Sequence, residues 1–460
     1  MPRLDGMLIL HVAVPGKNRS GLVHRQVTIL IYLKTGSPNS GGSFWSWPWL
    51  GQRLQESESR ELHEARAAFI QKFVRVECMT HRVAILTEII SPYRIPVFNA
   101  LGKREGIELK VIFLSETDPT QRQWRVYKDE IRFSYEVLPS WRFRSGRSHL
   151  LLNAGLSAPL KKFSPEAIIC GGYNYIASWQ ALMWARRRGV RFILWSESNA
   201  QDARGHRKPV EFLKAYFRKR CDGSVVPGKS AFEYLRLLGC PAGRIFTAPN
   251  AVDNDFFATR AEIARCHPAT FREKFGLPQR FILFVGRLIP EKGVFDLLQA
   301  YAKLESGLRS EVGLVFAGGG VSREELAQQA KRISPGTVCF LGFAQREDLA
   351  GLYALAETLV LPTHSDPWGL VVNEAMACGL PIIVSSVAGC SADLVEEGWN
   401  GYVVPPRDSK KLSAAIDSLV RQPELKRQMS ARSLERIGNY SPKACADGLA
   451  AAAISARTGP

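Results

Sequence analysis

Two series of short apolar runs, each run followed by a longer helical segment, dominate this 460-residue chain. Runs of this length that alternate with helices indicate parallel strands joined by crossover helices. The first series falls at 83–86, 109–114, 167–170, 191–195 and 223–226, and the second at 281–285, 313–317, 338–341, 358–361 and 381–384. Each series predicts one doubly wound sheet, so the sequence predicts an α/β protein with two such sheets.

The two series divide the chain into two Rossmann-like domains that face each other across a cleft. We expect an N-terminal domain at 79–262 and a C-terminal domain at 263–440, with the linker within 253–278, where the regular pattern weakens. A last helix at 441–460 is expected to pack back on the N-terminal domain. Open α/β sheets bind ligands at the carboxyl ends of their strands, so the cleft is the expected ligand site.

Residues 1–78 differ in character from the rest, with a Gly, Ser and Trp-rich stretch followed by a charged segment without strong periodicity. The compact pattern begins abruptly with Met79, directly before the first predicted strand. The hypothesis is that residues 1–78 are an extension or the product of a misassigned start site. Mass spectrometry that found them intact in the native protein would exclude the misassigned start.

The net charge of +18 favours an anionic partner and is concentrated in the N-terminal domain. Residues 81–262 carry 29 basic and 17 acidic residues, whereas 263–460 carry 22 and 20. A membrane surface, a phosphorylated acceptor or nucleic acid would each suit such charge, although Lys and Arg clusters usually belong to solvated helix faces. Nucleic acid is not expected from the motifs described below.

The nine cysteines form no CxxC pair and no metal-ligand spacing with histidine, which favours a reduced, cytoplasmic compartment. The longest early apolar run, 27–33, is far shorter than the roughly 20 residues that span a bilayer. Any membrane contact is therefore expected to be peripheral, at the inner face of the membrane.

The segment FVGRLIPEKGV at 284–294 places two cations just after a predicted strand. Gly286 ends the strand, and Arg287 and Lys292 precede the helix expected at 294–304. Arg and Lys donors fixed at one edge of a sheet stabilise a diphosphate leaving group most when it is most charged. The alternative is a surface Arg and Lys at an ordinary turn.

The segment THSDPWGLVVNEAMACGLPIIVSSVAG at 363–389 combines a loop with a helix that starts near Gly369 and Leu370. The free N–H groups at a helix N-terminus bind phosphate, and glycine permits a close approach. Asp366 and Glu374 lie eight positions apart, roughly two helical turns, so both carboxylates can accept sugar hydroxyls. An acid that only caps the helix would explain Asp366 but not the remaining residues.

The strings GRLIPEKG, SDPWGLVVNEAMACGLPIIVSSVAG and NGYVVPPRD closely resemble the C-terminal domain of retaining glycosyltransferases of family 4, which have the GT-B fold and form group 1 of the glycosyl transferases. The resemblance implies that Arg287 and Lys292 contact the donor diphosphate, Glu374 the nucleotide ribose and Asp366 the transferred sugar. Asp366 stands where the family usually has Glu, and the shorter side chain is expected to alter the choice of donor sugar. The resemblance also implies that Gly369 and Leu370 offer backbone N–H groups to the donor. Gly286, Gly318 and Phe343 are further candidate donor-binding residues, because small residues at strand ends let a base or phosphate approach the backbone, although tight strand-to-helix turns use glycine just as often.

The N-terminal domain resembles the family more loosely. Tyr93 and Arg94 follow the first strand, where the family commonly has a glycine-rich loop, although they could equally begin a helix. Glu197 ends a strand where many relatives carry a histidine near the transferred sugar. Residues 122–125 could form an acceptor-facing loop or a loop that packs its Trp124 for stability.

Asp253-Asn254-Asp255 matches the DxD that another glycosyltransferase fold uses to hold a divalent cation. Its context predicts instead a structural turn with Phe256 buried beside it. Because Arg287, Lys292 and a helix N-terminus already supply positive charge, neither a metal nor a cofactor is expected.

The expected reaction is transfer of a hexosyl unit from a nucleoside diphosphate sugar to a hydroxyl acceptor, with the retention that the family resemblance implies. Polysaccharide or glycolipid biosynthesis is the expected setting, and a lipid-linked acceptor is one option. Two alternatives stay open: a nucleotide-sugar epimerase on the same scaffold, and a non-catalytic protein that binds sugar nucleotides.

Overall fold

The computed structural model describes residues 7–18, 21–32, 80–118, 123–145, 148–201 and 208–455. The chain divides into two compact units, Met1–Arg75 and Val76–Pro460. In the first unit, β1 (Met7–Asn18) and β2 (Gly21–Tyr32) pair as an antiparallel hairpin in which Met7 lies opposite Tyr32. The origin of residues 1–78 stays a prediction.

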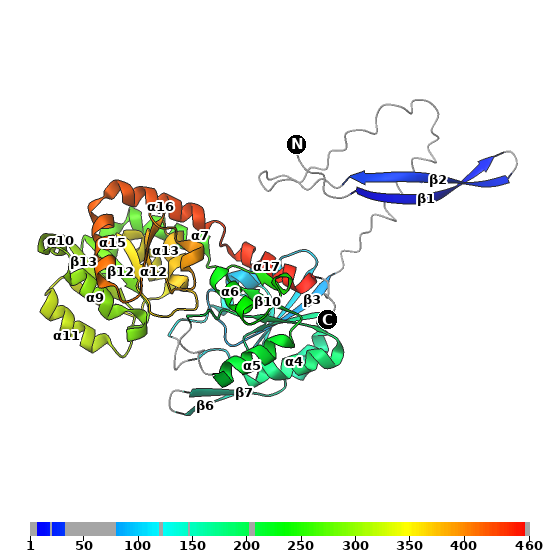
Figure 1. Cartoon of the computed structure of the whole chain (residues 1–460), viewed down its shortest axis with the longest axis horizontal. Helices are drawn as coiled ribbons and strands as arrows, with labels where there is room; N and C mark the ends of the chain where they lie inside the picture. Colours follow the sequence, from blue (N-terminus) through cyan, green and yellow to red (C-terminus); the bar gives the residue numbers. More distant parts are fainter. Residues whose placement is uncertain are drawn as a thin grey trace. The chain divides into compact units, whose positions relative to one another are not determined.

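The second unit begins with a seven-stranded parallel sheet in the order β11-β10-β9-β8-β3-β4-β5, of which Figure 1 labels β3 and β10. A hairpin, β6 and β7, follows β5. The bounds are β3 (His81–Thr87), β4 (Ile107–Phe113), β5 (Ser134–Val137), β6 (Ser140–Ser145), β7 (Ser148–Asn153), β8 (Ala167–Gly171), β9 (Arg191–Trp195), β10 (Gly223–Val226) and β11 (Ile245–Thr247).

Helices cover both faces of this sheet. Successive side chains of a strand point to opposite faces, and apolar side chains on each face are buried by helices. In β3, Val83 and Ile85 pack with α2 (Ile95–Gly102) and α17 (Pro442–Ile454). Ala84 and Leu86 pack on the other face with α4 (Ile176–Arg188) and α5 (Lys208–Lys219). A strand covered on both faces must be apolar at nearly every position, which is why these runs stand out in the sequence. The remaining helices are α3 (Ser157–Phe163) and α6 (Lys229–Leu237).

The second parallel sheet has six strands in the order β14-β13-β12-β15-β16-β17. One face packs against α7, α12 and α13, and the other against α9, α11 and α15. The bounds are α7 (Asn254–Cys266), α8 (Pro268–Phe275), β12 (Arg280–Val285), α9 (Val294–Ala302), α10 (Ser306–Glu311), β13 (Val312–Ala317), α11 (Arg323–Ile333), β14 (Val338–Gly342), α12 (Arg346–Leu355), β15 (Thr358–Leu361), α13 (Leu370–Ala377), β16 (Ile382–Ser385), α14 (Ser391–Leu394), β17 (Gly401–Val404), α15 (Ser409–Arg421) and α16 (Pro423–Ile437).

The expectation of an irregular linker at 253–278 is wrong. Helices α7 and α8 occupy that range, and Phe257 of α7 is buried in the core of the C-terminal domain. The chain therefore leaves the first sheet after β11 and enters the second domain at α7, earlier than the expected boundary at 262. It returns through α16 to α17, whose Cys445 and Leu449 lie in the core of the N-terminal domain.

Candidate functional site

The two motif loops lie side by side at the carboxyl edge of the second sheet, because β12 and β15 are neighbouring parallel strands. Thr363 Oγ1 donates to the carbonyl of Glu291 at 3.0 Å, and the backbone N–H of His364 donates to the same carbonyl at 2.8 Å. Gly293 has φ +70°, and a Cβ there would collide with the carbonyl of Pro362. Only glycine fits, so the approach of the two loops depends on it.

Lys292 and Asp366 meet where these loops touch. The Lys292 ammonium donates to Asp366 Oδ2, and the two side chains are 16% and 13% exposed. The other carboxylate oxygen, Oδ1, accepts the backbone N–H of Trp368 at 3.2 Å. A cation and an anion are thus held together, mostly shielded from water, at the strand ends where the sequence predicted a diphosphate and a sugar. Arg287, which follows β12 as Lys292 does, is exposed.

The glycines of the neighbouring loop hold backbone against backbone. A Cβ on Gly318 would collide with the carbonyl of Gly286, and one on Gly320 with the carbonyl of Leu288. Leu288 N–H also donates to the carbonyl of Gly319 at 2.8 Å. The glycines are therefore required by packing at the strand ends, whether or not a ligand approaches them. Phe343, which follows β14, is 45% exposed.

Glu374 lies on α13, the helix that begins after Gly369. Gly369 has φ +98°, and Leu370 is the first helical residue, as the sequence predicts. Glu374 is partly exposed, and its Oε2 accepts the hydroxyl of buried Tyr353 at 2.7 Å. Burial raises the pKa of the Glu374 carboxyl to about 7, while the Tyr353 hydrogen bond opposes that shift. Tyr353 carries no sequence signal beyond its place on a helix, and sequence reasoning missed it.

The predicted N-terminal residues gather around Trp195. Arg94 lies over the Trp195 ring at 3.9 Å, and its guanidinium pairs with Glu197. Arg94 also donates to Asn250 Oδ1 at 3.4 Å. Tyr93 packs edge-on against Trp124, with ring centres 6.0 Å apart. This contact matches the alternative in which the loop at 122–125 packs its Trp124 for stability. Arg94 precedes α2, so it combines a helix-start position with a place in this cluster.

Asn199 connects the two sides of the site and was missed by sequence reasoning. Its amide donates to the carbonyls of Asp366 and Pro367 at 3.3 and 3.4 Å, and the residue is 3% exposed. A polar residue shortly after a strand end, two positions beyond Glu197, was the signal that could have found it. The loop that carries Asp366 therefore touches the N-terminal domain directly.

A second connection runs through Asn373, which is fully buried on α13. Its amide donates to the carbonyl of Asn250 at 2.9 Å, and its Oδ1 accepts Trp368 Nε1 at 2.8 Å. Because Asn250 also contacts Arg94, the cluster around Trp195 and the Asp366 loop belong to one hydrogen-bonded network.

A third connection lies between residues 127–130 and the start of α12. Tyr127 OH donates to Glu347 Oε2 at 3.0 Å, and Arg346 pairs with Glu130 while its guanidinium lies 3.7 Å from the centre of the Tyr127 ring. Burial and the bond to Glu347 raise the pKa of Tyr127 to about 12. Arg122, predicted for the same region, lies outside the described residues.

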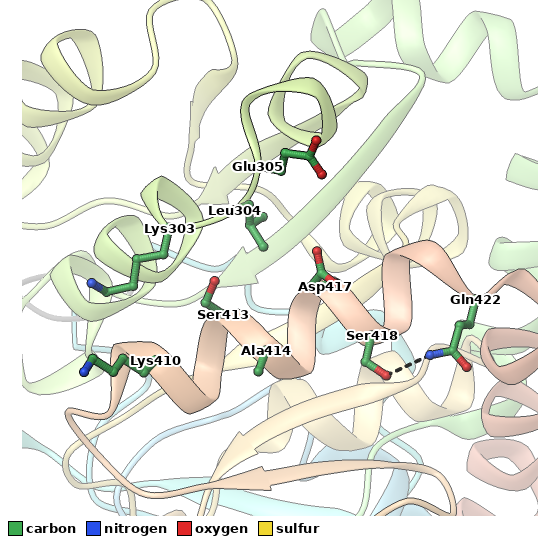
Figure 2. A pocket seen from close by; sticks show the side chains of 9 residues that line it. All are labelled: Lys303, Leu304, Glu305, Lys410, Ser413, Ala414, Asp417, Ser418 and Gln422. Carbon is green, nitrogen blue, oxygen red and sulfur yellow. Dashed lines mark hydrogen bonds between the residues drawn. The ribbon is translucent and has the colours of Figure 1, made fainter.

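A groove on the C-terminal domain lies away from this site. Figure 2 shows that residues 303–305, after α9, and α15 line it, with Ser418 and Gln422 hydrogen-bonded at 3.2 Å. Helix α9 begins at the carboxyl ends of the strands and runs back, so residue 303 lies towards their amino ends. The groove is therefore separate from the predicted donor loops.

The DxD sequence forms a helix start. Asp253 accepts the N–H of Phe256 at 3.0 Å as the N-cap of α7. Phe256 is partly buried against the core, and its neighbour Phe257 is more deeply buried, at 4% exposed. Among the residues that the structure describes, no three His, Cys, Asp or Glu side chains come together as metal ligands would. The same residues include no helix long and apolar enough to cross a membrane.

Comparisons with known proteins find related sequences. The model of the family described as glycosyl transferases group 1 matches residues 269–436. The chain is 32% identical over 297 residues to D-inositol 3-phosphate glycosyltransferase of Frankia alni. That alignment covers 60% of this chain and 71% of the Frankia protein. It is also 32% identical over 219 residues to O-antigen chain mannosyltransferase B of Escherichia coli. That alignment covers 47% of this chain and only 56% of the Escherichia coli protein.

The fold has matches among solved structures. HepE of Anabaena, in a crystal structure with UDP, aligns with a TM-score of 0.64 and 16% identity over 80% of this chain and 98% of that one. This likeness confirms the predicted GT-B fold, two doubly wound domains in one chain. With the family match and the Frankia relative, it leads to one conclusion: the chain belongs to the group 1 glycosyl transferases.

Proposed function

We propose that this chain transfers a hexosyl unit from a nucleoside diphosphate sugar to a hydroxyl acceptor, with retention at the anomeric carbon, as an enzyme of the family 4 type. The observation that carries the proposal is the shielded Lys292 and Asp366 pair at the carboxyl edge of a parallel sheet, where Arg287 also follows β12. The relatives named for glycosyl transfer, and HepE with its bound UDP, support the same reaction class. Polysaccharide or glycolipid biosynthesis on the cytoplasmic side of a membrane is the proposed setting.

In this proposal, Lys292 and Arg287 stabilise the diphosphate as it departs, because fixed cations act most strongly on the charge that grows in the transition state. Asp366 holds Lys292 in position and accepts hydroxyls of the transferred sugar. The network from Asn199 to the Asp366 loop fixes that loop against the N-terminal domain, where the acceptor would enter. A donor phosphate oxygen takes the acceptor's proton. No protein nucleophile is assigned.

The first prediction concerns donor binding. We expect sugar nucleotides of one base class to raise the melting temperature of the protein, because a ligand that binds only the folded state stabilises it, by about 2.7 kcal/mol at 100 times its Kd. Differential scanning fluorimetry against UDP-, GDP- and ADP-sugars measures this. Glu374→Ala should lose the shift, whereas the control Glu435→Ala, an exposed residue of α16, should keep it. A shift without transfer to any acceptor would favour the non-catalytic alternative, and no shift at all would contradict the donor site.

The second prediction concerns metals. Because two side-chain cations and the N-terminus of α13 lie beside the proposed diphosphate position, turnover should persist in excess EDTA. Initial rates measured before and after chelation, and again with added manganese, test this. Complete loss in EDTA that manganese restores would show that the charge on these residues is insufficient.

A further inference from the structure

The N-terminal domain exposes a group of large apolar side chains on neighbouring elements. Helices α4 and α5 and the β6 and β7 hairpin carry it, and Figure 1 shows these elements gathered at one side of the domain. The most exposed members are Phe212 (71%), Phe143 (55%) and Trp141 (54%). We call this group the apolar face; it consists of Trp141, Phe143, Met183, Phe212, Leu213 and Tyr216.

The elements that carry the apolar face are packed together, so the exposed residues share a rigid support. Trp179 of α4 stacks on Tyr216 of α5 with ring centres 6.2 Å apart. Arg186 of α4 donates to the carbonyl of Arg220 at 3.1 Å, and buried Leu151 of β7 lies in the same core cluster as both helices. Large exposed apolar side chains on elements that pack together are typical of an interaction surface.

The hairpin presents its apolar residues by strand alternation. Trp141 and Phe143 point to one side of β6, and Phe143 lies opposite Leu150, which is itself 48% exposed. Between them, Arg142 points the other way and pairs with Asp118 at 2.9 Å and Glu88 at 3.6 Å. Glu88 directly follows β3, so the hairpin is anchored at the carboxyl edge of the sheet, where the proposed acceptor side lies.

The exposed charge on α3, α4 and α5 is strongly basic. Arg187, Arg188 and Lys219 are exposed at the ends of α4 and α5, and Lys161 and Lys162 are exposed on α3. The sequences of α3, α4, β6 and β7 contain no Asp or Glu at all, and α5 contains one, Glu211, which pairs with Lys214. Such charge repels a second copy of the same face and attracts an anionic surface.

From exposed aromatic and aliphatic side chains on a part of the domain that also exposes Lys and Arg on α3, α4 and α5, we infer that this face docks on an anionic lipid bilayer. The apolar side chains enter the boundary between headgroups and acyl chains, while the basic residues attract acidic headgroups, each with a modest, salt-dependent contribution. The docked hairpin brings the carboxyl edge of the first sheet close to the lipid surface, while Arg142, Glu88 and Asp118 lie on the side of the hairpin away from the lipid. This inference does not depend on the proposed transfer reaction.

The test is cosedimentation of the full chain with vesicles of phosphatidylcholine, alone or mixed with phosphatidylglycerol. The wild type should bind the anionic vesicles only, and less at high salt. Phe212→Ser with Leu213→Ser should weaken binding about tenfold or more, because two buried apolar side chains are removed from the lipid. Ile263→Ser, a 47% exposed residue of α7 in the other domain, is the matched control and should bind as the wild type.

The charge component has its own pair of variants. Arg187→Glu with Lys219→Glu should weaken binding to anionic vesicles by about tenfold or more, since lost attraction becomes repulsion. Lys331→Glu with Arg332→Glu on α11 makes the same charge change outside the face and should have little effect. All these side chains are exposed, and a retained sugar-nucleotide shift in fluorimetry shows that folding and the donor site are intact.

Three results would overturn the inference. The first is equal binding of the wild type to neutral and anionic vesicles, or none to either. The second is unchanged binding of the face variants. The third is a dimer, seen by light scattering without lipid and lost in Phe212→Ser with Leu213→Ser, because a second copy would then cover the face.

Discussion

Lys292→Ala is expected to lower kcat by about 10² or more, with a smaller change in KM, because the lost ammonium stabilises charge that develops as the diphosphate leaves. Steady-state transfer rates with a saturating sugar nucleotide measure this. The control is Lys303→Ala, an exposed lysine of the groove in Figure 2, which lies away from the donor loops. Lys303→Ala should turn over at the wild-type rate.

The Lys292→Ala variant also loses stability, since Asp366 is then left mostly shielded without its cation. The double variant Lys292→Ala with Asp366→Asn separates the two effects. It should recover most of the lost melting temperature because the uncompensated charge is gone, yet it should stay inactive. A near-normal kcat in Lys292→Ala would contradict the role of Lys292, and recovered activity in the double variant would show that stability alone was at fault.

The sheets could be predicted because both of their faces are covered. A strand such as β12, whose residues 281–285 are all buried, must be apolar throughout and therefore stands out from its surroundings. Edge strands carry a weaker signal, although β14, at the edge of the second sheet, was predicted at 338–341. Strands β5 and β17, with partly exposed residues, and the short β11 were missed for this reason. Helices α7 and α8 were missed because their pattern is only weakly amphipathic, and Asp253 looked like a metal motif although it caps a helix.

The donor loops could be placed from the sequence because parallel topology brings the carboxyl ends of β12 and β15 to one edge. The partners of the predicted residues could not be predicted. The contacts of Asn199 with the Asp366 loop and of Tyr353 with Glu374 join residues 167 and 21 positions apart, and they depend on how the domains and helices pack. The prediction that Asp366 and Glu374 lie two helical turns apart was also too simple, because α13 begins only at Leu370 and each carboxylate has its own partner.

Glu374→Gln is expected to stabilise the free protein at alkaline pH while abolishing donor binding. Burial raises the pKa of the folded-state carboxyl from 4.5 to about 7. Below pH 4.5 the group is protonated in both states. Between pH 4.5 and about 7 the unfolded chain loses its proton first, so stability falls as pH rises. The full difference, about 3 kcal/mol, is lost above pH 7.

Urea unfolding of the wild type and of Glu374→Gln at pH 5, 6, 7 and about 8.5 measures this window. The free energy of unfolding of the variant relative to the wild type should rise across it and then level off. Glu435→Gln, an exposed acid on α16, is the matched control and should follow the wild type. A constant difference from pH 5 to 8.5 would show that Glu374 titrates normally in the folded protein. If stability rises as expected while the sugar-nucleotide shift disappears, Glu374 is kept at a cost to stability because the donor requires its carboxylate.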